Sequence, residues 1–351
     1  MAEGRRRPTM YDVARECGVS QATVSLVLNG VAGVRVAEQT RARIIEAAER
    51  LQYRRSSRVR ADARDPAAIG LIIDDLMASP FAAPIMEGAR EAAWEHQCVV
   101  EVISTRNNAP MEEAAIASLM SRPLAGIIYA TLFTREVTPP SIPAHTPVVL
   151  LNCYDAANAF TSAVPDDRGA AHALTKAMLN AGHSRIAHMA GESFLDAGRD
   201  RATGYRDALE EAGVAFDPDL LTMRGSAVQD AYDGTGALLD LPDPPTAIFC
   251  FNDRMALAVH EAARDRGLHV PHDLSVAGFD NDPFVTAFLP SLTTAVLPHE
   301  AMARWAVERI FNMRHQPRIS LPEQHRLKCQ LVRRKSIAKP RGLRRPHSLD
   351  A

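Results

Sequence analysis

The sequence predicts a small all-α helix-turn-helix domain followed by a larger α/β domain, which is folded as two lobes with parallel sheets. Apolar residues recur at helical spacing up to residue 51, and from residue 69 short apolar runs alternate with helical segments. With 351 residues, 46% of them hydrophobic, the chain can form two or three domains with large cores. It contains no run of about 20 apolar residues, so we expect no membrane helix.

Charge and cysteine usage narrow the class of protein. Residues 1–64 contain 13 Arg and 7 acidic residues, whereas the remainder contains 27 basic and 35 acidic residues. A basic N-terminal end indicates either a module that binds a polyanion such as DNA or a solvated surface. The five cysteines are scattered without CxxC spacing, and no secretion signal opens the chain. We therefore expect free thiols and a cytoplasmic protein.

The N-terminal region predicts three short helices. The first begins after Thr9 and ends before Gly18, and Ser20 is placed to cap a second helix that runs to Asn29. A third helix is expected over residues 38–51, with Ile44, Ile45, Ala48 and Leu51 on its buried face. Two short helices joined by a glycine-containing turn form a helix-turn-helix, whose second helix enters the DNA major groove.

Several motifs in this region resemble the headpiece of the LacI/GalR (lactose-repressor/galactose-repressor) family. They are Tyr11-Asp12-Val13-Ala14, Gly18-Val19-Ser20, Thr23-Val24-Ser25, Leu28-Asn29, Thr40-Arg41 and Leu51-Gln52-Tyr53, in family order and nearly at family spacing. The resemblance implies a transcriptional regulator, a repressor, that binds a double-stranded DNA operator of pseudo-palindromic sequence as a homodimer. It also implies a DNA-binding headpiece over residues 8–55 and a hinge over residues 56–66.

The residues expected to contact DNA fall into two groups. Those that open the second helix reach base edges, and the hydroxyl, amide and basic residues around them suit phosphate contacts. The full set is Thr9, Tyr11, Ser20, Gln21, Ala22, Thr23, Ser25, Leu26, Asn29, Thr40, Arg41, Tyr53, Arg58 and Val59. Gln21 is consistent both with a contact to adenine and with an ordinary exposed residue.

Three positions depart from the family pattern. Leu26 stands where the family commonly has an arginine. Because arginine reads guanine and leucine makes only apolar contacts, we expect the operator half-site to differ from that of the family. Arg55 replaces a proline directly before the hinge. Within the hinge, Asp62 falls where a leucine wedge is expected, which leaves Val59 as the apolar candidate. We expect such a hinge to rely on attraction between arginine and phosphate, with less DNA bending and stronger salt dependence.

The rest of the chain predicts alternating strands and helices. The expected strands are 69–74, 98–103, 126–129, 147–152, 185–189, 246–251 and 274–279, and the expected helices are 85–96, 111–121, 168–181, 201–212, 255–266 and 301–314. The α/β domain is predicted over residues 67–332. A basic tail over residues 333–351 is expected to be disordered.

Motifs in this domain resemble the effector domain of the same family. Among them are Gly182-His183-Ser184-Arg185-Ile186, Arg201-Ala202-Thr203-Gly204-Tyr205, Asn252-Asp253-Arg254-Met255-Ala256 and Leu292-Thr293-Thr294. The resemblance implies a periplasmic-binding-protein-like fold, with two lobes joined by three crossovers. It further implies dimerisation through this domain and a small sugar or sugar-like effector in the cleft.

Ligands of open α/β sheets bind beyond the carboxyl ends of the strands, where this chain places polar residues. The residues expected to bind the effector are Asp74, Asp75, Phe81, Asn152, Arg201, Asn252, Asp253 and Asp280. Carboxylates and amides bond sugar hydroxyls, and Arg201 and Asp280 are the leading candidates. Asp253 is also consistent with capping the next helix. Phe81, Phe133, Tyr154 and Phe160 are each consistent with stacking on a sugar or with core packing.

No catalytic constellation emerges from the sequence. GxGxxG, GxxxxGK[ST], HExxH and GxSxG motifs are absent, so we expect no enzyme activity, no cofactor and no metal. The twelve histidines are interpreted as surface or capping groups. An alternative is a stand-alone solute-binding protein with the same cleft fold, but the headpiece motifs and the lack of a signal peptide count against it.

Overall fold

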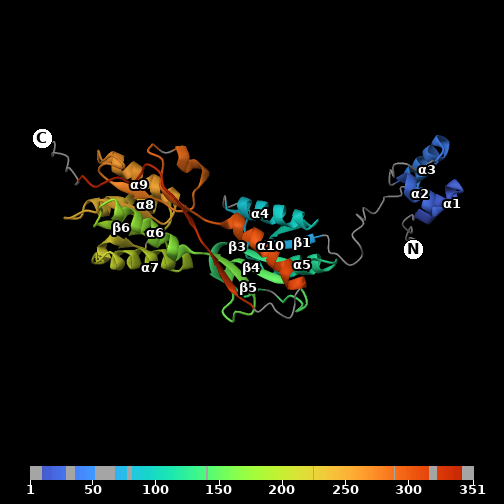
Figure 1. Ribbon diagram of the computed structural model, residues 1–351, viewed down its shortest axis with the longest axis horizontal. Helices are drawn as coiled ribbons and strands as arrows, with labels where there is room; N and C mark the ends of the chain where they lie inside the picture. The colour runs from blue at the N-terminus through green and yellow to red at the C-terminus, as the bar shows by residue number, and fades with distance from the viewer. Residues whose placement is uncertain are drawn as a thin grey trace. The chain divides into compact units, whose positions relative to one another are not determined.

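The computed structural model describes residues 10–28, 36–51, 68–76, 81–139, 141–223, 225–287, 289–315 and 322–341 (Figure 1). These residues belong to two compact units, residues 1–63 and residues 64–351. No helix within the described ranges is long and apolar enough to cross a lipid bilayer.

The N-terminal unit contains the predicted three helices, α1 (Met10–Cys17), α2 (Gln21–Leu28) and α3 (Glu38–Arg50). Gly18 has a φ of +62° in the turn between α1 and α2, a conformation that glycine adopts without strain. The backbone N–H of Thr23 donates to Ser20 Oγ at 3.1 Å, so Ser20 caps α2 as predicted. Val13 and Val24 are completely buried and form the centre of a small core.

The third helix packs through a face slightly different from the predicted one. Ile44, Ala47 and Ala48 are buried, whereas Ile45 is 44% exposed. The prediction that Ile45 faces the core is wrong, because the inward stripe follows the i, i+3, i+4 pattern from Ile44. Arg43 Nη2 also ties α3 to the end of α1 by donating to Cys17 O at 2.8 Å.

The first lobe of the larger unit is a six-stranded parallel sheet in the order β11-β5-β4-β3-β1-β2. Its strands are β1 (Ala68–Ile73), β2 (Val99–Ser104), β3 (Ile127–Glu136), β4 (Val148–Tyr154), β5 (Thr161–Pro165) and β11 (Gln324–Leu327). Its helices are α4 (Ala82–Glu95), α5 (Ala109–Met120) and α10 (His299–His315). Helices α4 and α10 pack together over one core, and α5 covers a second core on the sheet. The central strands of the sheet are therefore buried on both faces.

The second lobe is a four-stranded parallel sheet in the order β7-β6-β8-β9. Its strands are β6 (Ile186–Met189), β7 (Leu221–Thr222), β8 (Ala247–Cys250) and β9 (Ser275–Ala277). Helices α6 (Asp167–Asn180) and α7 (Asp196–Glu211) contribute to one core, and α8 (Val228–Leu239) and α9 (Asp253–Asp265) contribute to another. Short 3₁₀ helices lie at Pro218–Leu220 and Pro283–Ala287.

The chain crosses between the lobes three times, as the family resemblance implies. It passes from β5 to α6, from β10 (Thr294–Val296) to α10, and from β11 to β12 (Gln330–Val332). Strands β10 and β12 pair antiparallel in a separate ribbon. Figure 1 shows the two lobes with these connections running between them.

The predicted disorder from residue 333 is wrong for residues 333–341, which we call the C-terminal strap. Ser336 is fully buried, and its hydroxyl donates to Val276 O at 2.6 Å. The backbone N–H of Val276 donates to Ser336 O at 2.9 Å, so the strap lies beside β9, the edge strand of the four-stranded sheet. This pairing supplies partners for polar groups that would otherwise be unpaired at a sheet edge. The α/β domain thus reaches residue 341, beyond the predicted boundary at 332, and residues 342–351 lie outside the described ranges.

Candidate functional site

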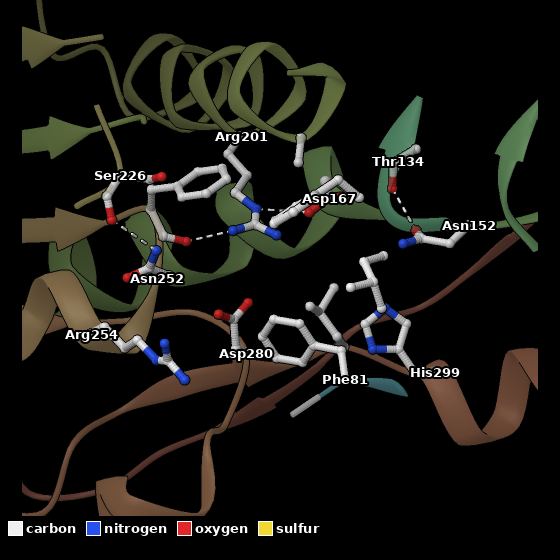
Figure 2. A pocket seen from close by; sticks show the side chains of 15 residues that line it. Phe81, Thr134, Asn152, Asp167, Arg201, Ser226, Asn252, Arg254, Asp280 and His299 are labelled. Carbon is white, nitrogen blue, oxygen red and sulfur yellow. Dashed lines mark hydrogen bonds and ion pairs between the residues drawn. The ribbon is translucent and has the colours of Figure 1, made fainter. Parts of the chain in front are cut away.

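A cavity of about 220 Å³ lies between the two lobes (Figure 2). The first lobe contributes Phe81, Leu132, Phe133, Thr134, Asn152 and His299, and the second contributes Asp167, Ala197, Arg201, Ser226, Phe251, Asn252, Arg254 and Asp280. Leu297, in the second crossover, also lines it. The cavity therefore combines apolar walls with several polar groups, as small-molecule sites commonly do.

Arg201 is held rigidly in this cavity. The side chain is almost completely buried, and its Nε donates to Asp167 Oδ1 at 2.7 Å. Its Nη1 donates to Phe251 O. The guanidinium carbon lies 3.5 Å from the ring centre of Phe279 and 4.5 Å from that of Phe251. Two hydrogen bonds and two aromatic rings therefore hold the guanidinium in one orientation.

Asp280 lines the second-lobe side of the cavity, as Arg201 does, and has a strained backbone conformation. Its φ is +110°, and its backbone N–H donates to Ala295 O at 2.8 Å. Figure 2 shows its carboxyl group between Arg254 and Phe81. Surrounding protein raises the pKa of Asp280 well above its usual value, and the charge of Arg201 opposes this effect. The position combines a left-handed backbone with a desolvated acid, which is typical of functional sites.

Asn252 and Asp253 follow β8 and have different roles. Asn252 Oδ1 accepts from the Met255 N–H at 2.8 Å, so Asn252 rather than Asp253 caps α9, while it also lines the cavity. Asp253 does not line the cavity. It accepts from Thr294 Oγ1 at 2.7 Å and from the Asp282 N–H at 2.8 Å, and burial raises its pKa to about 7. Asp253 therefore supports the loop that carries Asp280.

Of the other predicted effector residues, Asn152 and Phe81 line the cavity and Asp74 and Asp75 do not. Asp74 Oδ1 accepts from the backbone N–H groups of Asp75 at 2.8 Å and Leu132 at 3.1 Å, so its carboxylate bonds β3 where the pairing of that strand with β4 is irregular. Asn152 donates to Thr131 O at 3.0 Å and accepts from Thr134 Oγ1 at 2.7 Å. Its amide is thus already used within the first lobe.

Of the four aromatic residues proposed to stack on a sugar, two line the cavity and two do not. Phe81 and Phe133 line the cavity, where Phe251 joins them. Tyr154 instead donates to Asp196 Oδ2 at 2.7 Å, in a link between the lobes outside this cavity. Phe160 packs against the core beneath α5.

Several cavity residues were not predicted from the sequence, namely Thr134, Asp167, Ser226, Arg254 and His299.

The interpretation of the histidines as surface or capping groups is wrong for His183, His188 and His299, each at most 3% exposed. His183 hydrogen-bonds Thr246, Ser275 and Ala338 O, and His188 Nδ1 lies 2.9 Å from Phe249 O. Within the described ranges, no cluster of three or more His, Cys, Asp or Glu side chains could hold a metal ion.

The headpiece residues predicted to contact DNA are described in part. Ser20 and Gln21 are exposed at the start of α2, and Thr23, Leu26, Thr40 and Arg41 are half-buried. Tyr11, Ala22 and Ser25 lie in described helices, but their side chains are outside the description. Thr9, Asn29, Tyr53, Arg58 and Val59 lie outside the described residues, as do Arg55 and Asp62 of the hinge.

Comparisons with known proteins agree with this two-part architecture. Residues 9–56 match the model of bacterial regulatory proteins of the lacI family, and residues 175–337 match that of the periplasmic binding protein-like domain. Catabolite control protein A of Priestia megaterium is 32% identical over 83% of this chain and 87% of its own. The sucrose operon repressor of Escherichia coli is 32% identical over 92% of this chain and 98% of its own.

A solved complex of the transcriptional regulator CelR with cellobiose superposes with a TM-score of 0.64, at 27% identity over 94% of this chain and 100% of that one. The related proteins are regulators and repressors and not enzymes, in agreement with the lack of catalytic motifs. From the headpiece, the two-lobed domain and these relatives together, the chain belongs to the LacI family of DNA-binding transcriptional regulators.

Proposed function

We propose that this protein is a cytoplasmic repressor that binds a pseudo-palindromic operator as a homodimer and responds to a small sugar-like effector. The observation that carries the proposal is the cavity between the lobes, with Arg201 and Asp280 in its wall, in a chain that also has a helix-turn-helix. The names of the sucrose operon repressor and of the CelR–cellobiose complex support a sugar as the effector class.

Operator recognition is assigned to α2. Its N-terminal end exposes Ser20 and Gln21, and a helix that lies in the major groove reads bases through these first positions. Leu26, one and a half turns further on, offers an apolar surface to a thymine methyl group. Two headpieces related by a two-fold axis require a site with the same symmetry.

The effector is expected to bind first to the second lobe. Asp280 accepts hydrogen bonds from hydroxyl groups, and Asn252 and Arg254 lie beside it in the cavity wall. A ligand that also contacts the first lobe favours one arrangement of the lobes and thereby changes DNA affinity. It shifts the equilibrium by its differential affinity for the two states, typically about 1–3 kcal/mol.

A homodimer is supported by apolar side chains exposed on the first lobe. Trp94, Val99 and Met111 are 71%, 52% and 49% exposed, on the consecutive elements α4, β2 and α5. Strand β2 is also an edge strand of the six-stranded sheet. Exposed apolar groups on and beside an edge strand are typical of an interface with another chain.

In-vitro selection of random duplex DNA by the purified protein tests the DNA-binding part of the proposal. We expect a two-fold symmetric motif to be enriched, with half-sites that differ from the family pattern where Leu26 reads. Recovery of DNA without a common motif would contradict sequence-specific operator binding.

Calorimetric titration tests the effector part. The probes are D-glucose, D-galactose, D-ribose, sucrose and cellobiose, each added to the free protein and to its complex with the selected operator. We expect at least one of them to bind and to change operator affinity. Failure of all five to bind would contradict a sugar effector and would leave the DNA-binding proposal unaffected.

A further inference from the structure

Two side-chain contacts join the lobes outside the cavity. Tyr154, the last residue of β4 in the first lobe, donates its hydroxyl hydrogen to Oδ2 of Asp196, the first residue of α7 in the second lobe, at 2.7 Å. Arg326 of β11, in the first lobe, lies with Nη1 3.5 Å from Oδ2 of Asp200 in α7. All four residues line a groove of about 360 Å³, and none of them lines the cavity.

The second lobe holds the acceptor of the tyrosine bond in place. Asp196 Oδ1 pairs with Arg199 Nη2, and the Asp196 side chain is 15% exposed. The same arginine donates through Nη1 to Ser193 O at 3.0 Å and to Phe194 O at 2.9 Å. A hydrogen bond from a phenol to such a fixed and shielded carboxylate belongs to the stronger, charge-assisted class.

The tyrosine bond is the stronger of the two contacts. Burial and the neighbouring Asp196 raise the pKa of Tyr154 to about 12, so its hydroxyl keeps the proton at pH 7 and remains the donor. The side chains of Arg326 and Asp200 are 51% and 39% exposed, so water screens their attraction.

Helix α7 contacts the cavity and the first lobe through neighbouring positions. Ala197 and Arg201 line the cavity, and Asp196 and Asp200, each one residue earlier, contact the first lobe. Residues four apart lie on the same side of a helix, so both contacts come from one side of α7. A lobe arrangement that moves α7 away from β4 breaks the tyrosine bond. The bond therefore contributes to the free-energy difference between lobe arrangements whether or not the cavity is filled.

We propose that the Tyr154–Asp196 and Arg326–Asp200 contacts form an interlobe latch, which favours the present lobe arrangement without any molecule in the cavity. This inference goes beyond the proposed function, because it concerns the lobe equilibrium of the free protein. Loss of the tyrosine hydroxyl should lower the equilibrium constant for the latched arrangement by about tenfold.

The test measures the distance between the lobes in the protein without sugar or DNA. Nitroxide labels are attached through Asn312→Cys in α10 of the first lobe and Glu210→Cys in α7 of the second, both exposed positions. The five native cysteines are buried and take up little label. Labelled chains are mixed with an excess of unlabelled chains, so that double electron–electron resonance reports distances within one chain.

The variants are Tyr154→Phe, which removes only the hydroxyl group, and Arg326→Gln. We expect Tyr154→Phe to add a second population of distances and Arg326→Gln to cause a smaller change. Tyr232→Phe is the matched control, because Tyr232 donates to Asp265 Oδ2 at 2.7 Å between α8 and α9, within the second lobe. Its distances should equal those of wild type.

Identical distances in wild type and Tyr154→Phe would overturn the latch. Equal changes in Tyr154→Phe and Tyr232→Phe would also overturn it, since they would show a general loosening of the second lobe. Asp196→Ala gives an independent check, because adding Tyr154→Phe to it should change the distances no further. Since the measurement uses neither sugar nor operator, its outcome leaves the proposed function to be decided by its own tests.

Discussion

At the scale of single residues, Arg201 and Asp280 line the same cavity but contribute differently to stability. Arg201 compensates the buried charge of Asp167, which is 1% exposed. We expect Arg201→Ala to lower the free energy of unfolding by about 3–5 kcal/mol, because it leaves that carboxylate buried and unpaired. Urea denaturation followed by circular dichroism measures the effect.

Asp280→Asn is the matched control for Arg201→Ala. It removes a desolvated acid whose pKa is raised, so unfolding at pH 8 should require at least as much urea as in wild type. Sugar binding should nevertheless be lost, because the carboxylate acceptor is gone. An Arg201→Ala protein as stable as wild type would show that the pair with Asp167 does not support the fold.

Asp253 gives the protein a pH-dependent stability. Its pKa is about 7 in the folded protein against 3.8 ordinarily, so the folded state binds the proton more tightly than the unfolded state. The stabilising contribution is therefore complete below about pH 4 and is lost as the pH rises through 7. We expect the stability of wild type relative to Asp253→Asn to fall by up to about 4 kcal/mol between pH 4 and pH 8. A difference independent of pH, measured by urea denaturation, would contradict this assignment.

At the scale of elements, the sequence predicted β1 to β4, β6, β8 and β9 and missed five strands, of which β5 is buried and the others are short or mostly exposed. Strand β1 is buried at all six positions, so it reads as a continuous apolar run. Strands β7 and β12 have two and three residues, and β11 is mostly exposed, so their pairing depends on distant segments and leaves no local pattern. The same reason explains the strap, whose composition indicates disorder although its backbone pairs with β9.

The residues that line the cavity could also be predicted only in part. The rule that ligands lie beyond the carboxyl ends of strands found Asn152, Asn252 and Asp280. It could not give the direction of a side chain, and so it also included Asp74 and Asp253, whose carboxylates accept from the backbone N–H groups of Leu132 in β3 and of Asp282. His299 reaches the cavity only after the chain has crossed between lobes, which no local pattern in the sequence indicates.

The strap should stabilise the second lobe measurably. Ser336 and Ala338 bond the backbone and side chains around β9, and Arg334 donates to Leu292 O and Asn281 Oδ1 at 2.8 and 2.7 Å. Truncation after Val332 removes these bonds, and we expect a loss of roughly 3 kcal/mol in the free energy of unfolding. Truncation after Arg341 is the control and should have no effect. Equal stability of the two truncated proteins in urea would show that the strap contributes nothing.

At the scale of the whole molecule, the proposed response of DNA binding to the effector requires both the two lobes of one chain and the association of two chains. Within one chain, the lobes hold a cavity to which each contributes side chains. In the proposed homodimer, the α/β domains join two headpieces, so that the second headpiece binds DNA at a high effective concentration. A change of lobe arrangement is transmitted to DNA when it alters how the joined headpieces meet the two half-sites.

The dimer can therefore be tested through DNA binding. We expect Trp94→Asp to place a charge in the proposed interface, to lower the solution mass from twice 38.3 kDa to 38.3 kDa, and to weaken operator binding roughly 100-fold. Sugar binding should persist, because Trp94 does not line the cavity. Phe194→Asp is the control, since Phe194 is 75% exposed on the second lobe before α7, away from the α4–β2–α5 face. Light scattering with size-exclusion chromatography gives the mass, and a dimeric Trp94→Asp protein with full operator affinity would mean that this face is not the interface.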